Sequence, residues 1–115
     1  MLRTSPTTAR YAIDPTRLDL AREFRRFPKG PHSAELQKIV HRMRWSGAGG
    51  RYCVVPVEPG RRWMLALLPE IRGGPIQTFP ATTFTSLNDA EWHVFKIRWR
   101  ALTGADLPED LDYAT

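Results

Sequence analysis

The stretch NDAEWHVFKIRWRAL, residues 88–102, decides the fold, because it is long, has no glycine or proline, and holds two of the chain's four tryptophans. Ser86 before it is a suitable N-cap, and Asp89 suits the positive end of a helix dipole. At about 100° per residue, an apolar stripe runs along one side: Leu87, Ala90, Val94, Ile97 and Ala101. The stretch is therefore predicted to be a long amphipathic helix whose stripe closes a small core.

A second apolar face lies almost opposite this stripe. Trp92 and Trp99 are seven positions apart, and Phe95 lies between them and the stripe. A helix that is apolar on most sides is buried on most sides, and a small single-layer domain has little material to bury two opposite faces. The sequence therefore raises the question of what covers Trp92 and Trp99.

Three interpretations of the tryptophans compete. Large aromatic side chains usually serve a protein's own core, but Trp and Arg are also over-represented at binding hot spots. The third interpretation is nucleic-acid binding, with bases stacked on tryptophan and phosphates held by Lys96 and Arg100. We favour a partner chain, with an interface formed by Trp92, Phe95, Arg98 and Trp99 and, as secondary candidates, Tyr52 and Trp63.

Two shorter helices are predicted nearer the N-terminus. Asp14 as N-cap and Pro15 at the first helical position predict one helix, with Leu20, Phe24 and Phe27 at helical spacing. Ser33 is the predicted cap of the next helix, whose apolar stripe comprises Leu36, Ile39, Val40 and Met43. The glycines of SGAGG, residues 46–50, are predicted to end it.

The apolar pattern changes to short β-rich runs after residue 50. RYCVVPV and RRWMLAL are joined by Glu58-Pro59-Gly60, which is good turn chemistry, so we predict an antiparallel hairpin. Pro56 within the first run indicates an edge strand or a bulge, and PIQTF at 75–79 is a candidate third strand. The order is helix, helix, hairpin, loop, helix, so the predicted class is α+β.

Composition divides the chain into three parts. Residues 1–13 are rich in Ser, Thr and Pro and are predicted to be a flexible N-terminal arm, followed by a single α+β domain at 14–104. Residues 105–115 are acidic and without periodicity. We expect them to form a flexible tail, or to lie on a basic surface of this chain or of a partner.

The net charge of +5 comes mainly from arginine and fits either an anionic partner or a solvated surface. Cys53 is the single cysteine, and no stretch has the length of a membrane span or the apolar region of a secretory signal. We therefore expect a cytoplasmic protein that does not enter a membrane. No catalytic residue, cofactor site or metal site is predicted in this chain: His32, His41 and His93 lack the spacing of a local metal site, and no paired carboxylates or nucleophile–base arrangement can be argued.

The order of short blocks resembles a known family, the small (alpha) subunit of N,N-dimethylformamidase. The resemblance covers roughly residues 24–103 and rests on Leu36-Gln37 with His41 and Arg44, on Gly50-Arg51-Tyr52, on Arg72-Gly73, and on Ala90, Val94, Phe95 and Arg98. These blocks are not catalytic signatures.

The resemblance implies a two-subunit amidohydrolase that cleaves small N-substituted formamides to an amine and formate. It also implies that the iron site lies on a larger catalytic subunit and that the small subunit is an accessory chain in a hetero-oligomer. Two alternatives remain open at the level of the sequence: a small basic nucleic-acid-binding module, and a stand-alone homodimer that uses the tryptophan face.

Overall fold

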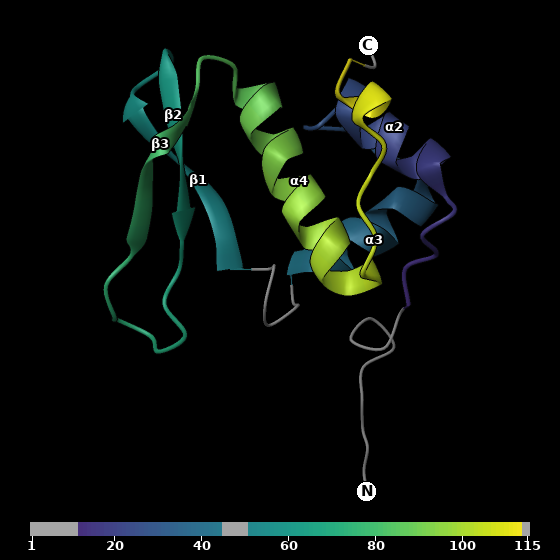
Figure 1. Ribbon diagram of the computed structural model, residues 1–115, viewed down its shortest axis with the longest axis horizontal. Helices are drawn as coiled ribbons and strands as arrows, with labels where there is room; N and C mark the ends of the chain where they lie inside the picture. The colour runs from purple at the N-terminus through teal and green to yellow at the C-terminus, as the bar shows by residue number, and fades with distance from the viewer. Residues whose placement is uncertain (1–11, 45–50, 114–115) are drawn as a thin grey trace, which may run out of the picture.

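The structure, a computed structural model, describes residues 12–44 and 51–113. Within these ranges the elements are α2 (Leu18–Arg26), α3 (Ala34–Arg44), β1 (Tyr52–Glu58), β2 (Arg62–Leu67), β3 (Gln77–Phe84), α4 (Leu87–Thr103) and the 3-10 helix η2 (Glu109–Tyr113). The predicted α+β class is confirmed. Figure 1 shows α4 in the middle, with the sheet beside one face and α2, α3 and η2 beside the other. None of the described helices is long and apolar enough to cross a bilayer.

Helix α2 begins later than predicted. Asp14 does not cap it; its Oδ1 instead accepts hydrogen bonds from the backbone N of Thr16 at 2.9 Å and from its Oγ1 at 2.6 Å. This local turn delays the helix to Leu18. Phe27, predicted on the buried stripe, is more than half exposed, because the helix has already ended at Arg26 and helical spacing no longer places the next residues.

Helix α3 is capped as predicted. The Oγ of Ser33 accepts a hydrogen bond from the backbone N of Leu36 at 3.3 Å. Glu23 of α2 fixes this cap, since its carboxylate accepts from both the N and the Oγ of Ser33, at 2.6 and 2.7 Å. Leu36, Ile39 and Met43 form the buried face. The predicted glycine stop at 46–50 lies outside the described residues.

The sheet is antiparallel with the order β1-β2-β3. The predicted hairpin and its turn are confirmed, with Gly60 at φ 75°, where an L side chain would be strained. The candidate third strand is also confirmed and is longer than PIQTF. Both outer strands carry a proline: the β1 register shifts between Pro56 and Glu58, and Pro80 lies where the β3 register jumps from Phe79 to Thr83. These prolines disfavour addition of another strand at either edge.

Helix α4 is capped at both ends by the residues that flank it. Ser86 accepts a hydrogen bond from the backbone N of Asp89 at 3.3 Å, as predicted, and Gly104 ends the helix with φ 76°. Of the predicted stripe, Ala90 and Val94 are buried, whereas Ala101 is exposed.

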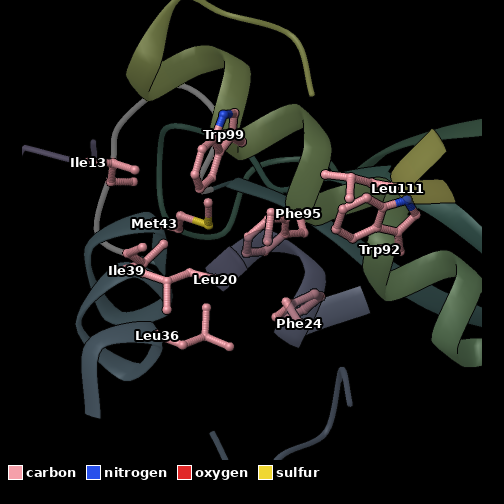
Figure 2. Packing of buried hydrophobic residues seen from close by; sticks show 11 residues of the cluster. Ile13, Leu20, Phe24, Leu36, Ile39, Met43, Trp92, Phe95, Trp99 and Leu111 are labelled. Carbon is pink, nitrogen blue, oxygen red and sulfur yellow. The ribbon is translucent and has the colours of Figure 1, made fainter. Parts of the chain in front are cut away.

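The main hydrophobic cluster lies on the other side of α4, between α4, α2, α3 and η2 (Figure 2). Its members come from all four elements and from the segment before α2: Ile13, Leu20, Ala21, Phe24, Leu36, Ile39, Met43, Trp92, Phe95, Trp99 and Leu111. The fold thus has three layers: the sheet, α4, and the group of α2, α3 and η2. Helix α4 lies in the middle and packs against both of the other layers.

Candidate partner interface

Trp92, Phe95 and Trp99 form an aromatic row along α4 that points into the main cluster (Figure 2). The ring centroids of Trp92 and Phe95 are 5.4 Å apart, and those of Phe95 and Trp99 are 5.8 Å apart. Phe24 of α2 stacks on Phe95 at 4.3 Å. Only 3% of Trp92 and 1% of Trp99 is exposed.

The favoured interpretation, in which another chain covers Trp92 and Trp99, is therefore wrong. It assumed a single-layer domain, whereas the chain supplies a second helical layer on the tryptophan side. As predicted interface anchors, Trp92, Phe95 and Trp99 are corrected to core residues. The core interpretation describes all three.

Residues 105–113 complete the cover over Trp92. Leu111 is 1% exposed and lies beside Trp92 in Figure 2. The Oδ1 of Asp112 accepts hydrogen bonds from Trp92 Nε1 at 2.7 Å and from Lys96 Nζ at 2.9 Å, and its backbone carbonyl accepts from Arg25 Nε at 2.9 Å. Partial burial raises the pKa of Asp112, but the hydrogen bonds from Trp92 and Lys96 outweigh burial and leave this pKa below its ordinary value. The acidic segment thus lies on a basic surface of its own chain.

Two other predicted interface residues meet at one end of the sheet. Arg98 Nη2 donates a hydrogen bond of 2.8 Å to the backbone carbonyl of Tyr52, the first residue of β1. Beside it, the backbone N of Leu68 donates to the carbonyl of Arg51 at 2.9 Å, and Arg51 Nη1 lies 3.2 Å from Glu70 Oε1. Arg98 of α4, the start of β1 and the residues after β2 are therefore held together.

The loop between β2 and β3, residues 68–76, exposes three large apolar side chains at this end of the sheet. Leu68 is 42% exposed, Ile71 is 78% exposed and Ile76 is 54% exposed. The loop has a defined shape, because the backbone N of Gly74 donates to the carbonyl of Ile71 at 3.0 Å and Gly73 takes φ 85°. Sequence reasoning missed these three residues. The sequence did hold a signal for Ile71 and Ile76. Both lie in the irregular stretch PEIRGGPI, where no helix or strand periodicity predicts that an apolar side chain is buried.

Trp63, the remaining predicted interface residue, lies apart from this end. It occupies the start of β2, pairs with Pro56 and Phe84, and is half-buried. Its role as a secondary contact stays a prediction.

Burial shifts the pKa values of two side chains near α4, Cys53 and His93. Burial raises the pKa of the Cys53 thiol, which keeps it protonated and weakly nucleophilic. Burial, and secondarily Lys96, lowers the pKa of His93. Across residues 12–44 and 51–113, no three His, Cys, Asp or Glu side chains are grouped as metal ligands.

The chain matches a protein-family model. The family model described as "N,N-dimethylformamidase alpha subunit" matches residues 3–108, which is most of the 115-residue chain. Comparisons with curated proteins and with solved structures give no match.

Proposed function

This chain belongs to the N,N-dimethylformamidase alpha subunit family, and from that premise we propose that it is the small, accessory subunit of a dimethylformamidase-like amidohydrolase. Its role is to bind and stabilise a larger catalytic subunit in a hetero-oligomer. The enzyme as a whole would hydrolyse small N-substituted formamides to an amine and formate in the cytoplasm. The family match is the observation that carries this proposal.

The β2–β3 loop is the best candidate for the surface that contacts the larger subunit. Contiguous exposed apolar side chains mark interaction sites when the chain has no use for them in its own core. Ile71 and Ile76 are large apolar side chains that the fold leaves exposed in one loop, and Arg98 with Tyr52 adds the kind of arginine and aromatic side chain that interfaces favour. The proposed interface thus keeps Arg98 and Tyr52 from the sequence prediction and replaces the aromatic row by the loop.

The iron that the resemblance implies needs its own ligand set. Carboxylate and imidazole side chains would have to converge on one point to hold it. The family match supports the proposal that this iron lies on the larger subunit.

The double substitution Ile71→Asp/Ile76→Asp tests the proposal. Placing two charges in an apolar contact should weaken assembly with the larger subunit by at least ~2 kcal/mol, since hot-spot losses have this size. The measurement is titration calorimetry of the two purified subunits, with hydrolysis of dimethylformamide by the complex as a second readout.

Tyr113→Asp is the matched control, because Tyr113 is 83% exposed but lies in η2 rather than in the loop. It should leave assembly unchanged. If wild-type chain and larger subunit do not associate, the accessory role is wrong. If the chain alone sediments as a dimer that Ile71→Asp/Ile76→Asp dissociates, the homodimer alternative replaces it.

A further inference from the structure

A groove of about 500 Å³ opens between α4 and the residues that run from the end of α2 to the end of α3. Lys29, Arg44 and Arg98 line it, against one carboxylate, that of Glu91. Its floor includes apolar side chains such as Val40, Met43 and Val94. The groove therefore combines an apolar floor with an excess of positive charge.

Arg44 and Arg98 bring two like charges close together in this groove. Burial lowers the pKa of Arg98, the nearby carboxylate of Glu91 raises it, and the charge of Arg44, a smaller effect, lowers it. A carboxylate placed between Arg44 and Arg98 would relieve this repulsion and would form charge-assisted hydrogen bonds with guanidinium groups. The geometry thus favours an anionic occupant.

The chain has few acidic side chains left to fill the groove. Ion pairs elsewhere on its surface hold most of the other carboxylates, among them Asp19, Glu35, Glu70, Asp89, Asp106 and Asp112. The sequence at residues 1–11, 45–50 and 114–115 contains no Asp or Glu. Most carboxylates of this chain are thus held away from the groove, which favours an acidic occupant from another molecule.

We propose that this groove receives an acidic, partly apolar segment of the larger subunit. The inference rests on the proposed function and names the chemistry of the partner surface. The apolar floor suits leucine-like side chains beside a carboxylate, and Glu91 in the lining disfavours the continuous negative charge of a nucleic acid. Arg98 links the groove to the interface above, because it both lines the groove and donates to the Tyr52 carbonyl.

Charge reversal of the exposed cations Lys29 and Arg44 tests this inference without changing the half-buried Arg98. Lys29→Glu/Arg44→Glu should weaken association with the larger subunit about tenfold or more, and should reduce the dependence of affinity on salt. Arg22→Glu/Arg26→Glu is the matched control: both arginines are exposed, neither lines the groove, and the change in net charge is the same. This control should bind the larger subunit as wild type does. Far-UV circular dichroism and thermal melting check that both variants fold.

Each result of this comparison is decisive. Equal losses in both double variants would mean that net charge alone matters, and unchanged binding of Lys29→Glu/Arg44→Glu would leave the accessory role standing while overturning the groove. If wild type fails to bind the larger subunit, the accessory role fails and the inference with it. A labelled single-stranded oligonucleotide is the last probe. If wild type binds it and Lys29→Glu/Arg44→Glu does not, the groove is a nucleic-acid site and the acidic-segment proposal is wrong.

Discussion

The aromatic row of α4 and the β2–β3 loop are both rich in apolar side chains, but the chain covers one and exposes the other. Trp92 and Trp99 lie under α2, α3 and η2, whereas Ile71 and Ile76 project from a loop. The larger and more conspicuous residues are thus the ones already used by the fold. An interface is identified by the apolar surface left exposed after folding rather than by aromatic content.

The difference arises from what lies opposite each region. The aromatic row faces two helices and a C-terminal segment whose apolar residues match it, so its burial stabilises the isolated chain. The loop follows the last residue of β2 and turns at Gly73, with nothing of the described chain packed over Ile71. Substitutions in the two regions should therefore separate stability from assembly.

The largest effect is expected from Trp99→Ala. Truncation of a fully buried tryptophan removes its contacts with the cluster and leaves a cavity, so the free energy of unfolding of the isolated chain should fall by ~3–5 kcal/mol. Urea denaturation followed by circular dichroism measures this loss. If the variant kept its stability but no longer assembled with the larger subunit, the aromatic row would be part of the partner interface after all.

Leu111→Ala should have the next largest effect. Leu111 is buried against Trp92 although it belongs to the acidic C-terminal segment, so its truncation should cost ~2–4 kcal/mol in the same denaturation experiment. Tyr113→Ala, two residues further on and exposed, should change stability by less than about 0.5 kcal/mol. Equal, small effects of both substitutions would show that residues 105–113 do not cover the row.

The carboxylate of Asp112 should make this cover sensitive to pH. Because its pKa is lowered in the folded protein, its contribution is present above the pKa of the unfolded chain and is lost as the pH falls through the folded value. Asp112→Asn keeps an oxygen acceptor for Trp92 but loses the charge that faces Lys96. As the pH falls from neutral into the acid range, wild type should therefore lose more stability than the variant. If the free energy of unfolding depended on pH in the same way in both proteins, the Asp112 carboxylate would not have this stabilising role.

The features predicted correctly from the sequence are those set by neighbouring residues. Ser86 caps α4, Ser33 caps α3 and Gly60 turns the hairpin, because capping and turn chemistry act over a few positions. The predicted start of α2 was wrong for an equally local reason, because Asp14 accepts a hydrogen bond from Thr16 instead of capping the helix.

What covers the aromatic row could not be predicted in this way. The cover depends on Leu111 and Asp112, which reach Trp92 from about twenty positions away and belong to a stretch without periodicity. Likewise, the meeting of Arg98 with Tyr52 follows from how α4 packs on the sheet. Such contacts are set by tertiary packing, to which local spacing gives no guide.

The smallest effect on stability is expected from substitutions in the β2–β3 loop. Ile71→Asp/Ile76→Asp replaces side chains that are mostly in water already, so no cavity forms and no charge is buried in the isolated chain. The denaturation midpoint should remain close to wild type, with a change below about 0.5 kcal/mol, even where assembly is lost. Trp99→Ala should behave in the opposite way, with low stability whether or not the partner is present. A large loss of stability from Ile71→Asp/Ile76→Asp would mean that the loop packs on its own chain in solution, and the apolar surface offered to a partner would then have to lie elsewhere.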